Sequence, residues 1–377
     1  MTVVTPTPTI LLFGGYTEPW LESIDRIHEQ AGKCAWLRLF LDDVAAVVRA
    51  ETRYMHPKIR DSLGPSSIFS SVQEVADLYR DHDDDVGFVQ CIMSYIVRAV
   101  ILLRWVHDSP DALKANPRPE GLGISGGLIN AALLAISDDF ESLREASVVT
   151  AGFVCRLCEV AGQVSRAVED GGSGSSSSWG CAVVGITPEK LDGILHQIQE
   201  SSKVPSLKRA RVGIRGDHWG TVVGPPSVLD ACLKDSRLGD VATQRLPIYS
   251  MQHNHELSQS HREYIAGQSA FHSKSVHPGF RIWGLRASDE DDDAVPPRCA
   301  NWGHLLLSVA DYAFSRPVDL VEMVKRLNNR LGAESCQGVQ LLVMGPTWFA
   351  GSLTSKAESD GKTSFGRPAH RARKRES

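Results

Sequence analysis

The chain has 377 residues, of which 42% are hydrophobic and 23% are charged, and its formal net charge is −5 at pH 7. This length is enough for one large domain with a sizeable core. The charge gives no sign of the basic face that nucleic-acid binding needs. No segment reaches the roughly 18 uninterrupted apolar residues of a membrane span. The first residues lack the basic start of a signal peptide, so we expect a cytoplasmic protein that binds neither nucleic acid nor membranes.

The first part of the chain predicts a buried strand followed by a series of helices. The stretch "TILLFGGYTEPW" is an apolar run of strand length that leads into Gly-Gly. Helical periodicity follows from about residue 20 to residue 110. Within it, "SYIVRAVILLRWV" is the most apolar segment, and two arginines interrupt it. We interpret this segment as a buried amphipathic helix.

A glycine-rich turn then leads into two more predicted helices. The first is "LINAALLAIS", and the second is the long segment "FESLREASVVTAGFVCRLCEVAGQVSRAVED". The second helix ends at "GGSGSSSS", a composition typical of a flexible linker.

After the linker the pattern changes to alternating strands and helices. "CAVVGI", "ARVGIRG", "GTVVGPP" and "RLPIYS" are predicted strands. "TPEKLDGILHQIQESS" is a predicted helix with Thr187 as its N-cap and Pro188 at its first position, and "SVLDACLKD" is a short helix capped by Ser227. The order β-α-β-β-α-β is the ferredoxin-like arrangement. We therefore predict a small subdomain at 178–250 inserted into a larger α/β domain formed by 9–177 and 251–348.

The last part of the chain predicts an acidic loop, two helices and a final strand. These are "SDEDDDAVPP", "NWGHLLLSVADYAF", "PVDLVEMVKRLNNRL" and "VQLLVMGPTW". Residues 349–377 are polar and basic, with too little apolar surface to offset the entropy of ordering, so we expect them to be disordered.

Eight cysteines are scattered along the chain, and only Cys155 and Cys158 lie close together. A structural zinc site needs a second pair, or histidines at a set spacing. We predict two reduced cysteines on one helix and no metal site.

The segment "GLGISGGLINAALLAIS" places Ser125 between glycines at the start of a predicted helix. Residues 123–127 fit G-x-S-x-G, in which the glycines allow a sharp turn that exposes the serine as a nucleophile. The N–H of Gly126 would donate to an oxyanion, and the "FGGYT" loop would supply a second donor from Gly15 or Tyr16. The competing interpretation is a glycine-rich helix start with Ser125 as its cap.

A nucleophilic serine needs a base, and the stretch "LPIYSMQHNHELSQSH" offers three histidines. His253 closely follows a predicted strand, in a loop from which it could reach across a cleft. His255 and His261 are alternatives, and each of the three taken alone is more often a solvated surface residue. Two further candidates lie downstream, His272 and His277.

Several stretches, taken together and in order, resemble the starter-unit acyl-carrier-protein transacylase domain of fungal non-reducing polyketide synthases. They are "LLFGGYT", "GISGGLINAA", Trp179, "VGPPSVL" and "LPIYSMQHNHEL", and the resemblance covers residues 9–348. It implies a malonyl-transacylase-like fold, with an α/β-hydrolase-like large subdomain and a ferredoxin-like insert.

The resemblance also implies an activity in polyketide biosynthesis, a branch of secondary metabolism. Such domains transfer a starter acyl group from acyl-CoA or an acyl carrier protein to a carrier-protein phosphopantetheine thiol, with no bound cofactor. It implies Ser125 as nucleophile and His253 as base, with Gly15, Tyr16 and Gly126 around the oxyanion. Arg156 matches an arginine of the family and is a candidate substrate-binding residue.

The sequence departs from the family pattern at three points. Ser125 stands where the family usually has cysteine, Gly15-Tyr16 replace an Asp-Gln pair, and "MQHNHE" retains only His253 in register. These departures leave a second hypothesis, a catalytically impaired remnant that binds a carrier protein or a synthase. A third is a serine hydrolase, which expects an acid between serine and histidine. Asp217 lies between them in sequence, but it falls in the predicted hairpin of the small subdomain.

The chain shows neither a ketosynthase cysteine motif nor a carrier-protein serine motif. We therefore expect either a free-standing transacylase or a fragment of a larger synthase.

Overall fold

The computed structural model describes residues 8–17, 19–57, 60, 69–81, 87–169, 178–285, 299–333, 339–345 and 363–366. The predicted acidic loop, nearly all of the serine-rich linker and most of the basic tail lie outside these residues. The one described piece of the tail is the strand β10 (Thr363–Gly366), which pairs with β9 (Val339–Val343). This strand departs from the expectation that the whole tail is disordered.

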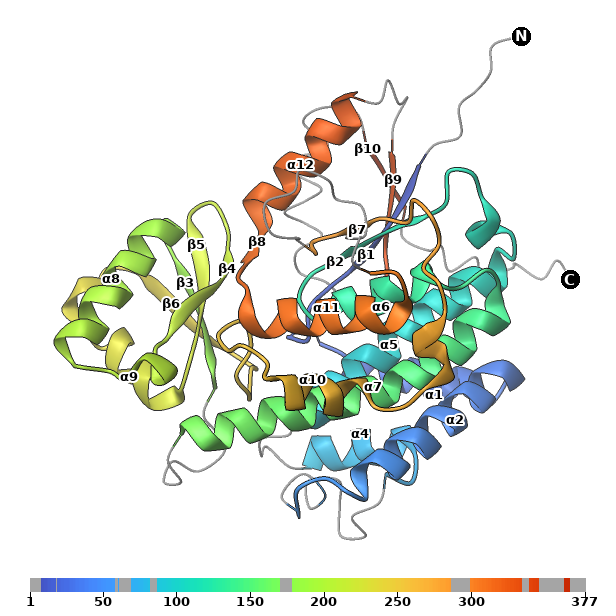
Figure 1. Cartoon of the computed structure of the whole chain (residues 1–377), viewed down its shortest axis with the longest axis horizontal. Coiled ribbons are helices and arrows are strands. Elements are labelled where there is room, and N and C mark those ends of the chain that lie inside the picture. The colour runs from blue at the N-terminus through green and yellow to red at the C-terminus, as the bar shows by residue number, and fades with distance from the viewer. Residues whose placement is uncertain are drawn as a thin grey trace, which may run out of the picture.

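A five-stranded parallel sheet forms the centre of the large subdomain, in the order β10-β9-β1-β2-β7 (Figure 1). The other three strands are β1 (Thr9–Phe13), β2 (Glu120–Gly123) and β7 (Ile282–Trp283). The apolar run "ILLF" in β1 is buried on both faces, as expected of a central parallel strand. Since β1 and β2 are parallel and pair Phe13 with Gly123, their carboxyl ends meet at one edge of the sheet.

Helices surround this sheet, and each of those named here except α10 falls in a segment that the sequence predicted to be helical. In the first part of the chain they are α1 (Leu21–Ala31), α2 (Ala35–Thr52), α4 (Val72–Asp81), α5 (Gly87–Asp108), α6 (Gly127–Ala132) and α7 (Phe140–Val168). In the last part they are α10 (Gln259–Ala266), α11 (Trp302–Ser315) and α12 (Leu320–Ala333). Short 3₁₀ turns lie at Ala112–Lys114, Leu133–Ala135 and Ala270–Ser273.

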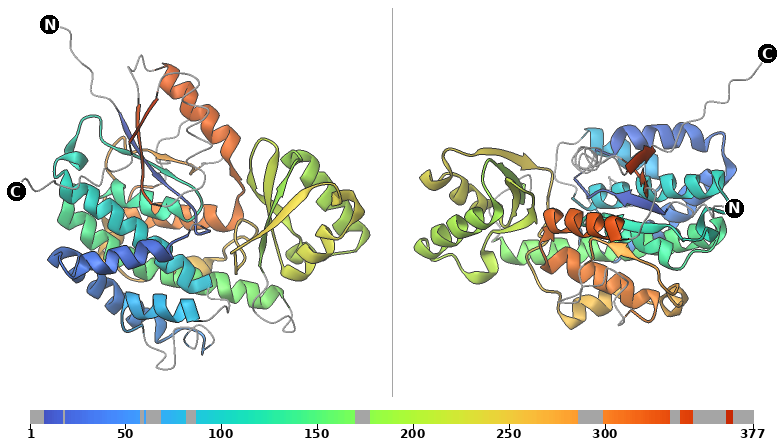
Figure 2. Two further views of the ribbon diagram at one scale, coloured as in Figure 1. Left: turned by 180° about the vertical axis from the view of Figure 1, so that it is seen from behind. Right: turned by 90° about the horizontal axis from the view of Figure 1, so that it is seen from above.

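The small subdomain projects from one end of the molecule, as both views of Figure 2 show. It contains β3 (Gly180–Val184), α8 (Pro188–Ser201), β4 (Arg211–Arg215), β5 (Trp219–Val223), α9 (Pro226–Leu233) and β6 (Ala242–Leu246). Short 3₁₀ turns lie at Ser206–Lys208 and Ser236–Leu238. This is the β-α-β-β-α-β order, and the four strands form an antiparallel sheet in the order β6-β3-β5-β4. The side chain of Thr187 accepts a hydrogen bond at the start of α8, and Pro188 occupies the first turn.

Three details of the small subdomain differ from the sequence prediction. Helix α9 begins at Pro226, because a proline at the first position needs no N–H partner, and Ser227 instead bonds to the carboxylate of Glu169. Strand β6 ends at Leu246, before Pro247, which has no N–H to donate to a ladder. A fifth strand, β8 (Val318–Asp319), pairs in parallel with β4 and comes from the segment assigned to the large subdomain.

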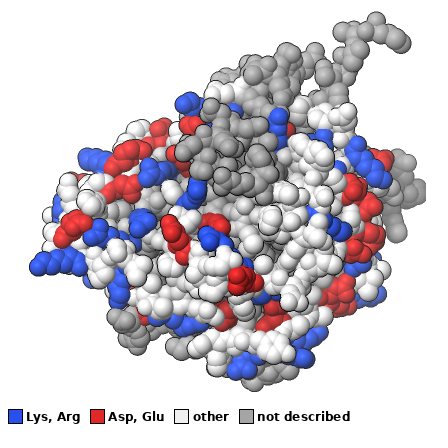
Figure 3. Space-filling view, viewed as in Figure 1, with Lys and Arg blue, Asp and Glu red and all other residues white. Residues whose placement is uncertain are grey.

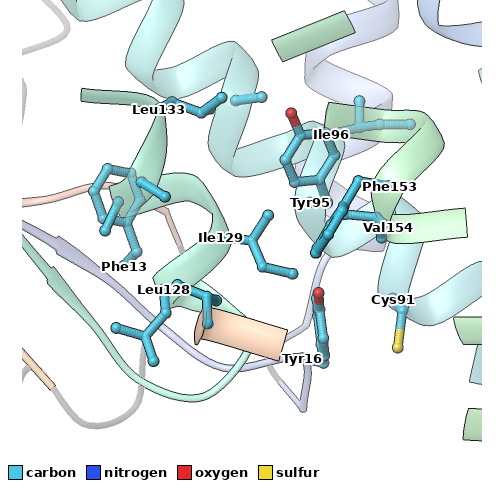
Figure 4. Close-up of a cluster of buried hydrophobic side chains, with 14 of the residues drawn as sticks. Phe13, Tyr16, Cys91, Tyr95, Ile96, Leu128, Ile129, Leu133, Phe153 and Val154 are labelled. Carbon is cyan, nitrogen blue, oxygen red and sulfur yellow. The ribbon is translucent and has the colours of Figure 1, made fainter. Parts of the chain in front are cut away.

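The core of the large subdomain lies where α5, α6 and α7 pack behind β1 and β2. Figure 4 shows Phe13 beside Leu128 and Ile129 of α6, with Tyr95 of α5 and Phe153 of α7 close by. All five side chains are at most 1% exposed. A separate core lies under α8 and α9 of the small subdomain, so each subdomain has its own apolar interior.

Among the residues that the structure describes, two helices, α5 and α7, are long and apolar enough to cross a membrane by length and composition alone. Within their most apolar windows, 83% and 72% of the residues are buried inside the protein. Burial of this extent is the property of core helices, which agrees with the interpretation of "SYIVRAVILLRWV". Cys155 and Cys158 both lie on α7, and neither forms a disulfide.

The turn between β2 and α6 is packed against β1 so closely that it excludes a side chain. A Cβ at Gly127 would lie 2.3 Å from the carbonyl oxygen of Phe13 and 2.5 Å from that of Gly14. We predict that Gly127→Ala lowers the free energy of unfolding by about 1–3 kcal/mol, as overpacking does. Urea denaturation would measure the change.

Gly193 in α8 is the matched control, because a Cβ there would have no neighbouring atom within 4 Å. Gly193→Ala should raise the free energy of unfolding by about 0.5–1 kcal/mol, since alanine favours the helix. Equal stabilities of Gly127→Ala and the wild type would contradict the close packing described for this turn.

Candidate active site

The candidate site lies at the carboxyl ends of β1 and β2, the usual place for a site in an open α/β sheet. The chain leaves β1 at Phe13 and runs into the loop Gly14–Thr17, and it leaves β2 at Gly123 and reaches Ser125 two residues later. The N–H of Ile124 still donates to the carbonyl of Phe13, at 3.0 Å. The pairing of the two strands therefore brings the two loops together.

Ser125 occupies the tip of a sharp turn between β2 and α6. Its φ angle is +52°, in the left-handed region that non-glycine residues rarely adopt. Holding a serine there costs roughly 1–3 kcal/mol, and such strain is concentrated at functional sites. The side chain is not a helix cap, because the residue before α6 is Gly126 and no side-chain cap is formed.

The glycines around Ser125 are required by close contacts on each side. A Cβ at Gly123 would lie 2.5 Å from Cα of Leu128, and one at Gly126 would lie 2.3 Å from the ring of Tyr16. Together with Gly127, these positions let the turn lie directly against β1 and the Gly14–Thr17 loop. The glycine-rich sequence therefore serves to bring Ser125 close to the Tyr16 loop.

His253 lies against Ser125, with its Nε2 2.8 Å from the Ser125 Oγ. Its other ring nitrogen, Nδ1, lies 2.8 Å from the carbonyl oxygen of Arg316. A carbonyl can only accept, so Nδ1 carries the proton and Nε2 of the neutral ring is left as an acceptor. The serine hydroxyl is then the donor in the Ser125–His253 hydrogen bond.

Both subdomains hold His253 in place. Its N–H donates to the carbonyl of Ala313 in α11, at 2.9 Å, and its φ angle is +55°. The side chain of the next residue, Asn254, donates to the carbonyl of Arg209 in the small subdomain, at 2.7 Å. A Cβ at Gly213 of β4 would lie 3.2 Å from Cβ of His253, so the small sheet also touches the histidine.

Burial lowers the pKa of the His253 imidazole to about 4, and the hydrogen bond to the Arg316 carbonyl opposes this effect. The side chain is 4% exposed. At neutral pH the ring is therefore uncharged, with a free lone pair on Nε2 that faces a hydroxyl. This is the arrangement that a general base requires.

A pocket of about 30 Å³ adjoins the two side chains, between the two subdomains. It is lined by Gly15, Tyr16, Thr17, Ile124, Ser125, Ile214, Thr221, Val223, Ile248, Gln252, His253 and Leu320. Side chains alternate along β5, so Thr221 and Val223 face the pocket while Val222 packs under the helices of the small subdomain. None of these twelve residues carries a charged side chain at neutral pH.

Gly15 and Tyr16 line this pocket, and Gly126 lies under the Tyr16 ring. Neither the Tyr16 N–H nor the Gly126 N–H donates a hydrogen bond to another residue that the structure describes. Burial raises the pKa of the Tyr16 hydroxyl well above its usual value, so the ring is uncharged. These two amides flank Ser125 and remain available to a ligand.

Arg156 lies elsewhere, with its guanidinium paired with Glu51 of α2. It also donates to the carbonyls of Ile265 and Ala266 at the end of α10, at 3.0 and 3.2 Å. These bonds connect three helices, and Arg156 is not among the described residues that line the pocket. The substrate-binding role considered for Arg156 has no support in this arrangement.

The other candidate histidines also lie outside the pocket lining of the described chain. His261 completes a capping box with Ser258 at the start of α10. His277 lies 3.3 Å from Asp138, and burial lowers the pKa of its imidazole. Of the candidate bases, His253 is the one that the structure brings to Ser125.

Sequence reasoning missed the groups that orient His253 and those that line the pocket. The Arg316 partner is a backbone carbonyl, which has no sequence signature. Ile214 and Leu320 reach the pocket from opposite subdomains, so no local pattern marks them. One group of residues could have been noticed in the sequence. The apolar segment "VQCIMSYIVRAV" places Gln, Ser and Arg four residues apart, which puts them on one face of a helix.

On the described part of the face in Figure 3, basic and acidic side chains are interspersed. This part of the face therefore presents no extended field of a single sign.

A family model described as "Starter unit:ACP transacylase in aflatoxin biosynthesis" matches residues 11–253. The chain is 37% identical over 361 residues to the non-reducing polyketide synthase hmp3 of Hypomyces subiculosus, a match that covers 95% of this chain and 17% of hmp3. For the non-reducing polyketide synthase curS2 of Aspergillus terreus the identity is 37% over 357 residues, covering 94% and 16%. The chain thus spans about one sixth of the length of these curated relatives.

Solved structures with the same fold include an acyl-carrier-protein S-malonyltransferase from Burkholderia pseudomallei. The TM-score is 0.56 and the identity 14%, and the match covers 95% of each chain. A loading acyltransferase of the avermectin modular polyketide synthase matches with a TM-score of 0.52 and 15% identity, over 95% of this chain and 94% of that one. These likenesses confirm the predicted fold class, a large α/β subdomain with a small inserted subdomain.

We predict that the His253 imidazole stays neutral down to about pH 4, with its proton on Nδ1. Its folded-state pKa lies below the usual value of about 6.5, so the folded state binds fewer protons than the unfolded state between these two pH values. Stability should therefore fall as pH drops from about 6.5 toward 4. ¹⁵N NMR of histidine-labelled protein would measure the titration and the tautomer, with His253→Gln to assign the signal. A midpoint near 6.5, or a proton on Nε2, would contradict the hydrogen bonding described here.

Proposed function

Since the chain belongs to the starter unit:ACP transacylase family, we propose that it transfers a starter acyl group from a thioester donor, through Ser125, to the phosphopantetheine thiol of an acyl carrier protein. The family resemblance identified from the sequence motifs is confirmed by the family match. The donor is an acyl-CoA or an acyl carrier protein. The observation that carries the proposal is the 2.8 Å contact between the Ser125 Oγ and the Nε2 acceptor of His253.

In the first half-reaction the Ser125 Oγ attacks the thioester carbonyl and its proton moves to Nε2 of His253. The Oγ–C bond forms, and the carbonyl oxygen becomes an oxyanion between the Tyr16 and Gly126 amides. The C–S bond then breaks, the imidazolium returns the proton to the departing thiolate, and acyl-Ser125 remains. The nearby Arg316 carbonyl would accept a hydrogen bond from the imidazolium throughout.

In the second half-reaction the same groups work in reverse. The phosphopantetheine thiol gives its proton to Nε2 of His253, and its sulfur attacks the acyl-Ser125 carbonyl. The C–S bond forms, the C–Oγ bond breaks, and the proton returns to Oγ. A neutral, buried histidine suits both halves, because each begins with proton removal from a neutral hydroxyl or thiol.

The geometry favours transacylation over the serine-hydrolase alternative. That class uses a carboxylate to orient the histidine. Here Nδ1 of His253 bonds to a backbone carbonyl, and within the described residues no carboxylate bonds to this ring. Asp217 lies in the turn between β4 and β5 and is not among the residues that line the pocket.

The pocket lining favours an uncharged, aliphatic acyl group. Ile124, Ile214, Val223, Ile248 and Leu320 supply apolar surface, and no lining side chain is cationic. The free carboxylate of a malonyl group would lose its hydration there without gaining a charged partner. We therefore propose a neutral starter unit.

The proposed partner is the acyl carrier protein of a polyketide synthase, on the same chain or a separate one. The relatives are non-reducing polyketide synthases about six times as long as the aligned region. One solved structure with this fold is a malonyl-transacylase in complex with the acyl-carrier protein of a type II polyketide synthase. The proposed compartment is the cytoplasm.

We predict that incubation with neutral acyl-CoAs adds one acyl group to the wild type and none to Ser125→Ala. Malonyl-CoA should react at least about tenfold more slowly, because its free carboxylate has no charged partner in the pocket. Intact-protein mass spectrometry over time would measure both rates. Addition of a holo acyl carrier protein should move the acyl group to that protein.

Ser137→Ala is the matched control, because Ser137 is also buried but donates only to the Leu133 carbonyl of its own turn. It should be acylated like the wild type. Absence of an adduct with every donor would contradict the proposal and support the alternative of an inactive, carrier-binding remnant. Rapid release of free acid without any acceptor protein would support a hydrolase.

We also predict that His253→Gln lowers the acylation rate at pH 7 by about 10²–10⁴, the range for loss of a general base. Glutamine has no comparable basic nitrogen, so the acylation rate should be reduced even in a variant that folds normally. The same mass-spectrometric time course measures the rate, and circular dichroism checks the fold. His261→Gln serves as the control, since His261 lies in the capping box of α10 and does not line the pocket. A smaller loss for His253→Gln than for His261→Gln would exclude His253 as the base.

A further inference from the structure

Three polar side chains lie on one buried face of the mostly apolar helix α5. Gln90, Ser94 and Arg98 are spaced four residues apart, so they stack along one side of the helix. Their exposed fractions are 5%, 2% and 1%. Burying polar groups in this way is unfavourable unless each is hydrogen-bonded.

All three side chains converge on two consecutive carbonyl groups of the loop beside the nucleophile. Nε2 of Gln90 donates to the Tyr16 carbonyl at 2.8 Å, and Oγ of Ser94 donates to the same oxygen at 3.4 Å. The Arg98 guanidinium donates to the carbonyl of Gly15. One face of α5 thus holds the backbone of this loop.

These bonds fix the direction of the loop amides as well as its position. In a trans peptide the C=O and the N–H point in opposite directions within one rigid plane. Holding the Gly15 carbonyl against Arg98 therefore aims the Tyr16 N–H away from α5. That N–H donates no hydrogen bond to another residue that the structure describes.

Arg98 also brings a positive charge to the same peptide group. Its guanidinium carbon lies 5.9 Å from the centre of the Tyr16 ring. A cation that bonds to a carbonyl polarises the peptide and strengthens the N–H of that unit as a donor. The Tyr16 N–H is thereby prepared for an anionic oxygen.

We propose that Gln90 and Arg98 are positioning residues, which act through the Tyr16 and Gly15 carbonyls to aim the Tyr16 N–H at the oxyanion of acyl transfer. This inference rests on the proposed function only in that it takes Ser125 to be the nucleophile. Neither side chain touches the acyl group. The loss of an ordinary packing residue should slow every reaction at residue 125. The loss of these positioning residues should slow a reaction that forms an oxyanion and leave unchanged one that forms none.

The test compares two reactions at residue 125. Acylation by p-nitrophenyl acetate forms an oxyanion, and its burst of p-nitrophenolate gives the rate. Alkylation of Ser125→Cys by iodoacetamide is a displacement that forms no oxyanion. We expect Gln90→Leu and Arg98→Met to slow acylation about tenfold to hundredfold, mainly in kcat, while the alkylation rate in the Ser125→Cys background stays within about twofold. Arg98→Lys, which keeps the charge, should recover part of the loss.

Gln199→Leu is the matched control, because Gln199 is a buried glutamine of the small subdomain that donates to the carbonyls of Leu195 and Ala210. It should leave both rates unchanged. Parallel loss of acylation and alkylation in the α5 variants would overturn the proposal and leave only structural support of the loop. Unchanged acylation would overturn it as well.

The same experiment separates this inference from the proposed function. If p-nitrophenyl acetate acylates Ser125 but no acyl-CoA or acyl carrier protein does, the proposed function fails and the α5 variants still decide the inference. If the ester does not acylate the wild type, the loop forms no working oxyanion site and the inference fails too.

Discussion

The candidate site depends above all on the parallel pairing of β1 with β2, which sets Phe13 beside Gly123. From that register the chain has only two residues in which to reach Ser125 and only three to reach Tyr16. The glycines at 123, 126 and 127 follow from this short distance, since each would place a Cβ against a neighbouring atom. The same register brings the Gly15 and Tyr16 carbonyls within reach of α5. The positions of Ser125, the loop amides and the helix that holds them are therefore consequences of one strand pair.

The histidine is positioned by a different part of the molecule. His253 follows the small subdomain in sequence, bonds to the end of α11, and has a neighbour, Asn254, that bonds back to the small subdomain. Its neutral state results from burial, and its tautomer results from the Arg316 carbonyl. Both members of the pair therefore belong to the large subdomain, and the small subdomain contacts the His253 side of the pair through Arg209 and Gly213.

Much of this arrangement could be predicted from the sequence because local patterns encode it. The alternation of strands and helices after residue 178 gave the β-α-β-β-α-β order, and Thr187 and Pro188 marked the start of α8 correctly. The G-x-S-x-G pattern located the turn at Ser125. Features that depend on distant backbone atoms could not be predicted, among them the Arg316 carbonyl and the pairing of β8 with β4. Arg156 was misleading because a sequence match does not reveal that Glu51 and two carbonyls already occupy its guanidinium. The row of Gln90, Ser94 and Arg98 could be predicted only in part. The four-residue spacing is visible in the sequence, but the Gly15 and Tyr16 carbonyls to which these side chains donate are not.

Strand β8 determines which segments would have to be exchanged together in a chimera of this protein and a relative. Residues 318–319 complete the edge of the small sheet, the Arg316 carbonyl two residues earlier holds His253, and Leu320 immediately afterwards lines the pocket. The small subdomain is continuous in space but not in sequence. A chimera that exchanged only the insert between β3 and β6 would join a foreign β4 to a native β8, and any mismatch there would displace the imidazole. A chimera that keeps these contacts would exchange the insert together with the segment from Arg316 to Leu320, because a boundary drawn from sequence alone separates residues of the candidate site.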